Sequence, residues 1–175
     1  MSDKVGKVLF TREQIEERAR EIGEQIARDY AGEDIYLIGT LRGAVVWMAD
    51  MMKNIPNDME IDFIMASSYG SGTTSSGSVK IKKDLEGDIK GKNVIIVEDI
   101  VDTGTTLKFL KEHLAEREPK SIKICTLLDK PSRRVADIHA DYTGFSIDNL
   151  FVIGYGLDYD QKYRNLPYIG VIEQQ

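Results

Sequence analysis

The sequence predicts an α/β fold in which a parallel central sheet is flanked by helices. A short apolar run at 35–38 precedes a helical segment at 44–53, and a β-branched run at 93–97 precedes another helical segment at 106–115. A further apolar run at 122–128 completes a strand–helix–strand unit, and such units are right-handed and parallel in nearly all sheets. The run at 93–97 shows no polar alternation, which is typical of a central strand covered on both faces.

The chain before this unit predicts an amphipathic helix that ends near Gly32. Thr11 is followed three residues later by Gln14, which is the pattern of a capping box at a helix start. Apolar side chains then recur at helical spacing at Ile15, Ala19, Ile22 and Ile26.

The helix predicted at 44–53 carries apolar side chains around more than one face, and a single sheet can bury only one stripe of a helix. We therefore expect the remaining apolar surface, which includes the only tryptophan, Trp47, to be exposed and to form the contact of a homo-oligomer. The alternative is that the N-terminal helix or the tail covers this second face.

Residues 59–83 predict a hairpin with a long tip. Alternating apolar residues give its first strand one drier face, formed by Met59, Ile61, Phe63 and Met65. The segment 70–78 contains only small and polar residues, but both of its flanks are strand-like, so a lid fits better than a domain linker. We expect Ser68 and Tyr69 at the hinge of this flexible lid.

Composition indicates one soluble domain. The 175 residues are 42% hydrophobic and 30% charged, with a net charge of −6 and a pI near 5.0, so we expect neither nucleic acid nor a membrane as a partner. Cys125 is the only cysteine and the N-terminus has no apolar signal segment, so we expect a cytoplasmic protein.

Three carboxylates, Glu98, Asp99 and Asp102, follow the central strand at 93–97. Thr-Gly-Thr-Thr at 103–106 comes next, at the start of a helix. Open α/β sheets bind ligands at this edge, and the amides of a helix start suit a phosphate. Carboxylates would repel that phosphate, so they are expected to contact ribose hydroxyls, a metal ion or a proton that is removed.

This stretch resembles the phosphoribosyl diphosphate (PRPP) motif of the type I phosphoribosyltransferases. Further segments similar to the hypoxanthine(-guanine) members of that family lie at 41–43, 67–70, 128–131, 151–159 and 163–167. The resemblance implies one type I phosphoribosyltransferase domain over 1–175, with a core at about 30–140 and a small hood from the N-terminal segment and about 141–175. It also implies purine salvage, in which hypoxanthine or guanine receives the phosphoribosyl group of PRPP with Mg²⁺ as cofactor, by a homodimer or homotetramer.

The same resemblance implies a role for each residue of the motif. Asp102 would be the general base that accepts the proton of purine N7. Glu98 and Asp99 would hold the ribose hydroxyls and, together with Asp158, the Mg²⁺. The 5′-phosphate would be held by Thr103, Gly104, Thr105 and Thr106.

Two further groups of residues follow from the resemblance. The pyrophosphate would be held by Leu41, Arg42, Gly43 and Arg164. The purine would be held by Lys130, Phe151, Val152 and Asp158. Many relatives have Lys where Arg42 stands, and the family often has a cis peptide between Leu41 and this residue.

A regulator is the alternative from another class: some proteins like these transferases bind PRPP or nucleotides as signals and also bind RNA or DNA, which the net charge disfavours here. A P-loop and a dinucleotide-binding Gly-x-Gly-x-x-Gly motif are both absent from the sequence. Hypoxanthine, guanine and xanthine all carry O6 and remain open as substrates. We interpret several polar residues as solvated surface residues: His113, Lys120, Arg133, Arg134 and His139.

Overall fold

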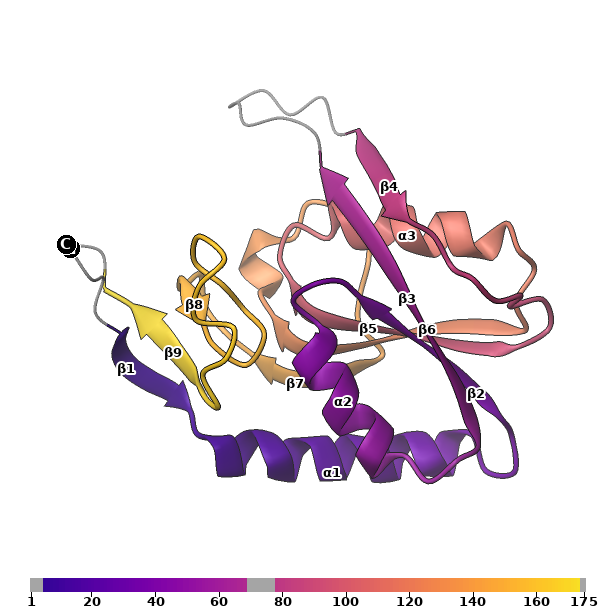
Figure 1. Ribbon diagram of the computed structural model, residues 1–175, viewed down its shortest axis with the longest axis horizontal. Coiled ribbons are helices and arrows are strands. Elements are labelled where there is room, and N and C mark those ends of the chain that lie inside the picture. Colours follow the sequence, from indigo (N-terminus) through magenta and orange to yellow (C-terminus); the bar gives the residue numbers. More distant parts are fainter. Residues whose placement is uncertain (1–4, 69–77, 174–175) are drawn as a thin grey trace.

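Figure 1 shows two sheets of unequal size in the computed structural model, which describes residues 5–68 and 78–173. The larger sheet has the strand order β4-β3-β2-β5-β6-β7. Its strands are β2 (Ile35–Thr40), β3 (Met59–Ser68), β4 (Val79–Lys83), β5 (Asn93–Val101), β6 (Ser121–Asp129) and β7 (Tyr142–Ser146). Neighbouring strands from β3 to β7 are parallel, and β4 is an antiparallel edge strand. The predicted α/β fold with a parallel central sheet is confirmed.

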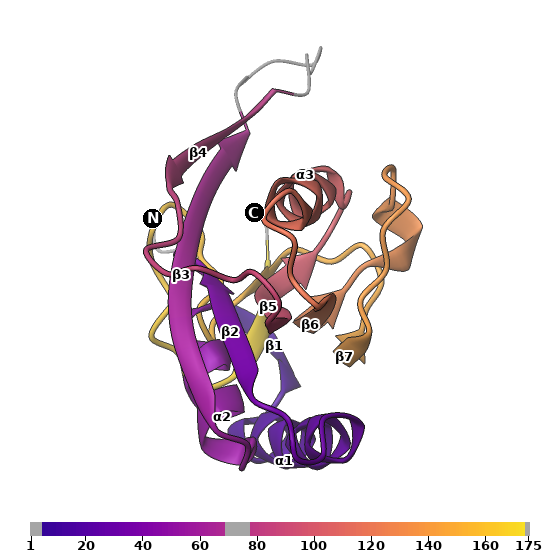
Figure 2. The same cartoon turned by 90° about the vertical axis from the view of Figure 1, so that its right-hand side faces the viewer.

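Helices cover both faces of this sheet, as Figure 2 shows. α1 (Arg12–Asp29) and α2 (Val45–Asn54) lie on one face, and α3 (Thr105–Ala115) lies on the other. The capping box predicted for α1 is present, because the Gln14 amide donates to Thr11 Oγ1 at 3.2 Å and the Thr11 amide donates to Gln14 Oε1 at 2.9 Å. Within the described residues, no helix is long and apolar enough to cross a membrane.

The smaller sheet joins the two ends of the described chain. It consists of β1 (Val5–Phe10), β9 (Ile169–Ile172) and β8 (Val152–Ile153), which pair in that order and are antiparallel. A 3-10 turn, η1 (Pro131–Arg133), follows β6. Strands β1, β7 and β9 were not predicted from the sequence.

Two predictions about apolar surfaces are wrong. Trp47 is fully buried, because α1 packs against α2 and covers the helix face that we expected to be exposed. In β3 the buried face is the opposite one: Asp62 and Ile64 are buried, whereas Ile61 is 43% exposed. Asp62 can be buried because its carboxylate is fully hydrogen-bonded, and the alternating pattern contains no sign of that.

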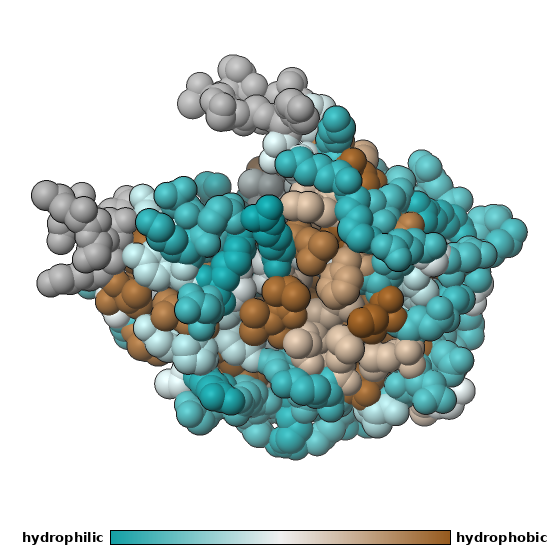
Figure 3. Space-filling view, viewed as in Figure 1, coloured by the Kyte–Doolittle hydropathy of each residue, from teal (hydrophilic) through white to brown (hydrophobic). Residues whose placement is uncertain are grey.

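An apolar patch nevertheless remains where α2 and β3 lie side by side, and Figure 3 shows this face of the molecule. Val45 and Ile61 are exposed there, and Met52 and Phe63 are half-buried. We call these four residues the α2–β3 patch.

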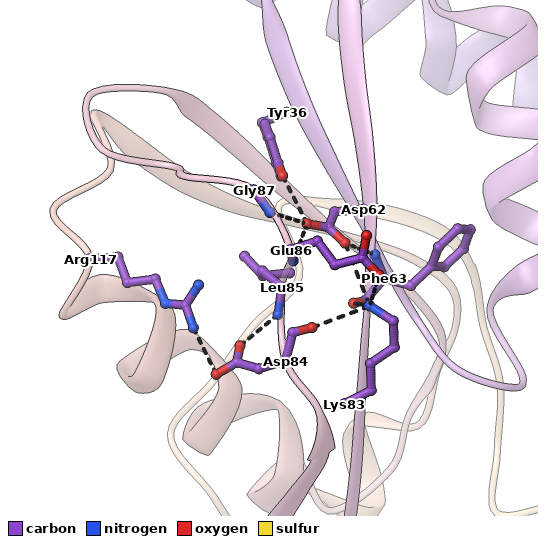
Figure 4. A network of polar contacts seen from close by, with 9 residues as sticks. All are labelled: Tyr36, Asp62, Phe63, Lys83, Asp84, Leu85, Glu86, Gly87 and Arg117. Atoms are coloured by element: carbon purple, nitrogen blue, oxygen red, sulfur yellow. Dashed lines mark hydrogen bonds and ion pairs between the residues drawn. The ribbon is translucent and has the colours of Figure 1, made fainter.

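Asp62 ties β3 to the segment that follows β4, as Figure 4 shows. Its carboxylate accepts hydrogen bonds from the Tyr36 hydroxyl at 2.9 Å and from the amides of Phe63 at 2.7 Å, Glu86 at 2.9 Å and Gly87 at 3.0 Å. Strands β2 and β3 and the 86–87 turn are therefore held by one side chain.

Asp84 ties the same segment to α3 and to the turn after it. Its carboxylate lies 2.7 Å from an Arg117 guanidinium nitrogen and 2.9 Å from His113 Nε2. His113, whose side chain is 26% exposed, is therefore partly solvated and contacts a carboxylate from another element.

Candidate active site

The site begins where β5 and β6 end side by side. β5 extends to Val101, so Glu98 and Asp99 belong to the strand and Asp102 follows its last residue. Val101 is in register with Asp129 of β6, and the Lys130 amide donates to the Val101 carbonyl at 2.9 Å. Asp102 and Lys130, which the sequence placed in separate motifs, therefore lie next to each other at the carboxyl edge of the sheet.

The 103–106 turn leads directly into α3. Gly104 is the N-cap residue with φ of 82°, and no side chain caps the helix start. A Cβ atom at Gly104 would lie 2.5 Å from Ile138 Cγ2, so the turn is packed tightly as well as left-handed. A cavity of about 120 Å³ beside the turn is lined by Glu98, Asp102, Thr103 and Thr106 among others. Open amides at a helix start next to a small cavity form a suitable phosphate site.

Glu98 and Asp99 occupy different environments. Glu98 Oε1 accepts hydrogen bonds from Thr40 Oγ1 at 2.6 Å and from the Asp99 amide at 3.0 Å. Burial raises the pKa of Glu98, and the neighbouring Asp99 carboxylate raises it further. Asp99 instead packs against the 41–43 loop, since a Cβ atom at Gly43 would lie 1.7 Å from Asp99 Oδ2.

The 41–43 loop lies between Asp99 and the 154–158 turn. Its Leu41–Arg42 peptide is cis, as the resemblance implied. A Cβ atom at Gly156, where φ is 98°, would lie 2.1 Å from the Gly43 carbonyl oxygen. The two loops therefore touch through glycine backbones, and only glycine permits this approach.

Gln161 joins the charged residues of these two loops. The side-chain oxygen Oε1 of Gln161 accepts hydrogen bonds from Arg42 Nη1 at 3.2 Å and from Arg164 Nη2 at 3.0 Å. The backbone amide of Gln161 donates to Asp158 Oδ2 at 2.8 Å. Arg164 also pairs with Asp158 at 3.0 Å. Gln161 was not predicted as a site residue, because nothing in the local pattern distinguishes it from a surface glutamine.

The predicted purine residues differ greatly in exposure. Lys130 is only 8% exposed, and its ammonium has no hydrogen-bond or ion-pair partner among the described residues. Phe151 is 45% exposed, and its ring meets the Tyr159 ring edge-on at 5.6 Å between centroids. Val152 is buried in β8. An unpaired lysine and an exposed aromatic ring are both suited to binding a planar ligand that carries an acceptor oxygen.

Of the two arginines after Lys130, Arg133 is exposed as we interpreted, whereas Arg134 is not solvated. Arg134 is 12% exposed at its side chain and binds three groups: the Asp102 carbonyl, the Ile138 carbonyl and the Asp129 carboxylate. Arg133 Nε lies 3.0 Å from Asp102 Oδ1. Arg133 therefore contacts the carboxylate that we predicted to be catalytic, and Arg134 holds the backbone carbonyl of the same residue.

The predicted metal ligands have oxygen donors that suit Mg²⁺. Among residues 5–68 and 78–173, however, no three His, Cys, Asp or Glu side chains cluster closely enough to hold a metal ion by themselves. Mg²⁺ usually takes one or two carboxylates and completes its shell with water and substrate phosphates. Glu98, Asp99 and Asp158 therefore fit an ion that a phosphate-rich ligand brings with it.

The predicted lid lies largely outside the described residues. Ser68 is the exposed last residue of β3. Tyr69 and the following residues up to Gly77 are not among those described, so the lid stays a prediction.

Comparison with family models identifies a phosphoribosyl transferase domain over residues 8–160. A hypoxanthine-guanine phosphoribosyltransferase of Streptococcus pneumoniae is 51% identical over 175 residues, which cover all of this chain and 97% of the relative. One from Streptococcus thermophilus is 49% identical over 171 residues, 98% of this chain and 95% of the relative.

Solved structures show the same relationship. A hypoxanthine-guanine phosphoribosyltransferase from Bacillus anthracis superposes with a TM-score of 0.94 at 49% identity, covering 97% of this chain and all of the other. A hypoxanthine phosphoribosyltransferase from Staphylococcus aureus superposes with a TM-score of 0.93 at 48% identity, covering 97% of this chain and 92% of the other.

Proposed function

The chain belongs to the phosphoribosyltransferase family and is an enzyme of that family, and we propose that it transfers the 5-phosphoribosyl group of PRPP to hypoxanthine and guanine. The products are IMP or GMP and pyrophosphate. Purine N9 forms the new bond to the anomeric carbon while the bond to the pyrophosphate oxygen breaks, and the N7 proton passes to Asp102.

The observation that carries this proposal is the adjacency of Asp102 and Lys130 at the ends of β5 and β6. Their chemistry is complementary: a carboxylate accepts the N7 proton, and an unpaired ammonium donates to O6 on the same edge of a 6-oxopurine. Phe151 offers its exposed ring for stacking on the purine, and the Val152 carbonyl accepts from a ring or exocyclic N–H of the base. Adenine has an amino group at the O6 position and would leave the Lys130 ammonium without an acceptor, so we expect its exclusion.

The remaining predicted residues support the PRPP side of the reaction. The uncapped turn of Thr103, Gly104, Thr105 and Thr106 suits the 5′-phosphate, and the 41–43 loop with Arg164 suits the pyrophosphate. Glu98 and Asp99 lie beside the ribose position, where the charge of Asp99 favours a transition state with positive charge on the sugar ring.

Mg²⁺ is the cofactor of this proposal, bound mainly by PRPP and aided by Asp158, Asp99 and Glu98. When bound, it neutralises charge that develops on the leaving pyrophosphate. The Arg42–Gln161–Arg164 chain is placed to orient the same group from the protein side.

The experiment is a spectrophotometric assay with each of hypoxanthine, guanine, xanthine and adenine, with PRPP and with or without Mg²⁺. We expect Mg²⁺-dependent formation of IMP and GMP and no product from adenine. Turnover of adenine at a comparable rate would refute the role of Lys130, and no turnover of any 6-oxopurine would refute the function.

The proposal includes a homo-oligomer, at least a dimer, that forms through the α2–β3 patch. The patch is apolar and exposed, although it excludes Trp47, and α2 begins directly after the 41–43 loop. Association through this patch would therefore also brace the pyrophosphate loop.

Light scattering of the protein and of Ile61→Glu tests this interface. We expect a dimer or tetramer for the unmodified chain and a monomer with a raised KM for PRPP for the variant. A fully active monomer of 19.7 kDa at micromolar concentration would contradict both the interface and its coupling to the site.

Three other predictions stay part of the proposal. The larger sheet and its helices form the core of one domain, and the smaller sheet contributes to its hood. The 70–78 segment is a lid over PRPP, with its hinge at Ser68 and Tyr69. The enzyme works in the cytoplasm, where the single buried thiol of Cys125 stays reduced.

A further inference from the structure

The 103–106 turn carries no positive side chain. The small cavity beside it is lined instead by the carboxyl groups of Glu98 and Asp102. A phosphate monoester carries about 1.5 to 2 negative charges at neutral pH, and a helix start offers only about half a positive charge. A phosphate at this turn therefore needs a cation from another element.

Arg134 is near the turn, but its guanidinium already binds other groups of the protein. Its guanidinium donates to the Asp102 carbonyl at 3.2 Å and to the Ile138 carbonyl at 2.6 Å, and it pairs with Asp129. A Cβ atom at Gly104 would lie 2.9 Å from Arg134 Cδ. Arg134 is thus part of the packing under the turn.

Arg133 is placed differently. The contact of its Nε with Asp102 Oδ1 at 3.0 Å is the only hydrogen bond or ion pair of its side chain among the described residues, and this side chain is 46% exposed. The segment that carries it is fixed to the turn, because the Val135 and Ala136 amides donate to the Thr103 carbonyl at 2.9 and 3.0 Å. Asp102 directly precedes Thr103, so a guanidinium that touches Asp102 can reach the turn by rotating its own side chain.

We propose that Arg133 is the cation that binds the 5′-phosphate of the nucleotide, and that in the empty enzyme it is held on the carboxylate of Asp102. This inference rests on the proposed function, because it takes the 103–106 turn as the phosphate site. Arg133 is a binding residue in this account, and Asp102 remains the general base.

The exchange of partners is energetically reasonable. An ion pair between two half-exposed side chains contributes little, whereas an arginine binds a phosphate with two parallel hydrogen bonds. A bound phosphate can therefore take Arg133 from Asp102. The carboxylate of Asp102 is then free to accept the N7 proton of the purine, because the purine binds at the same edge of the sheet.

The first test measures inhibition constants of IMP and ribose 5-phosphate against PRPP for the unmodified enzyme, Arg133→Ala and Arg133→Lys. We expect Arg133→Ala to weaken both ligands roughly 10- to 100-fold and Arg133→Lys to recover part of the loss. The matched control is Arg20→Ala, since Arg20 is also half-exposed and paired with carboxylates but lies on α1.

Two results for Arg133→Ala would overturn the inference. The first is an unchanged inhibition constant for IMP, and the second is weaker inhibition by IMP with an unchanged inhibition constant for ribose 5-phosphate. The second result would mean that Arg133 acts only on the purine side. An unmodified enzyme that binds neither ligand and forms no nucleotide would remove the proposed function instead, and this inference with it.

The second test examines the exchange itself by calorimetry with ribose 5-phosphate, which has no purine to contact Asp102. Asp102→Asn releases Arg133, so it should tighten binding more when Arg133 is present than in the Arg133→Ala background. Equal tightening in both backgrounds would show that Asp102 and the phosphate do not compete for Arg133.

Discussion

The two edges of the central sheet use polar residues in opposite ways. At the amino edge, a cavity of about 500 Å³ is lined by Glu33, Glu60, Lys92 and Lys120 among others, and these charges pair with each other. Lys120 lies 2.6 Å from Glu33, and Lys92 lies 2.7 Å from Glu60. At the carboxyl edge, the cavity at the phosphate turn is far smaller, at about 120 Å³. There, however, the Lys130 ammonium has no partner among the described residues, and Gly104 at the N-cap of α3 has no side chain to cap the helix.

The volume of a cavity therefore does not identify a binding site in this protein. Charged side chains that already pair with each other gain little from a ligand, because the ligand must replace hydrogen bonds that already exist. Groups held in place without partners gain a full hydrogen bond from the ligand. We therefore expect substitutions at the carboxyl edge to reduce activity and matched substitutions at the amino edge to leave it unchanged.

Asp102→Asn should give the largest effect. The amide cannot accept the N7 proton, so kcat should fall by roughly 10²- to 10⁴-fold while PRPP still binds. Steady-state kinetics with hypoxanthine and PRPP measure this change. An unchanged kcat would mean that water or another carboxylate is the base.

Lys130→Met should reduce kcat/KM for hypoxanthine by roughly 10- to 100-fold, because a charged hydrogen bond to O6 is lost while the apolar stem is kept. The KM for PRPP should change much less. Equal losses for both substrates would contradict a specific role at the purine.

Gly156→Ala should raise the KM for PRPP by roughly tenfold, a change that corresponds to about 1.4 kcal/mol. The new methyl group meets the Gly43 carbonyl oxygen and displaces the pyrophosphate loop. Gly32→Ala at the amino edge is the control, because φ there is also positive, at 75°, but nothing lies within 4 Å of the new atom. Both variants should lose stability through backbone strain, and only the first should lose affinity for PRPP.

Acid should destabilise the fold through Asp62. Burial by itself would raise the pKa of this carboxyl group, but hydrogen bonds from Gly87, Phe63, Tyr36 and Glu86 lower its pKa below the usual 3.8. The carboxylate therefore contributes its full stabilisation above pH 3.8 and loses it as the pH falls through the lower value of the folded state.

Asp62→Asn tests this contribution. At pH 7 the variant should lose about 1–3 kcal/mol in the free energy of unfolding, measured in urea, and its stability should depend less on pH below 4 than that of the unmodified protein. If the free energies of unfolding of the two proteins changed in parallel with pH down to pH 2, this contribution of Asp62 would be contradicted.

Lys120→Met should have the smallest effect, with kinetics unchanged and stability altered by no more than about 1 kcal/mol, because the ion pair that it removes is exposed. A loss of activity comparable to that of Lys130→Met would contradict the expectation that substitutions at the amino edge leave activity unchanged.

Local patterns predicted most of the larger sheet. The runs at β2, β5 and β6 are mostly apolar, and the capping box at Thr11 places the start of α1. The strands that were missed, β1, β7 and β9, are short and each contains a glycine, so they show neither alternation nor a continuous apolar run. β1 and β9 form by pairing between distant parts of the chain, and no local signal reports such pairing.

The site divides in the same way. The carboxylates and the 103–106 turn are contiguous in sequence and could be predicted together. Thr40 and Arg133 contact these residues from other segments, and Gln161 contacts Arg42 at the pyrophosphate loop. Single polar residues of this kind carry no pattern of their own. The exposed face of β3 was predicted wrongly because the buried Asp62 has partners that only the tertiary structure supplies.

The side chain of Lys130 also bears on the stability of the enzyme with and without ligand. Although the residue is only 8% exposed, its ammonium is not among the buried polar atoms of the described residues that lack a partner, so water reaches the charged end while the apolar stem is packed. A nucleotide that supplies an acceptor to this ammonium binds the folded enzyme and not the unfolded chain. The melting temperature should therefore rise with the concentration of a 6-oxopurine nucleotide.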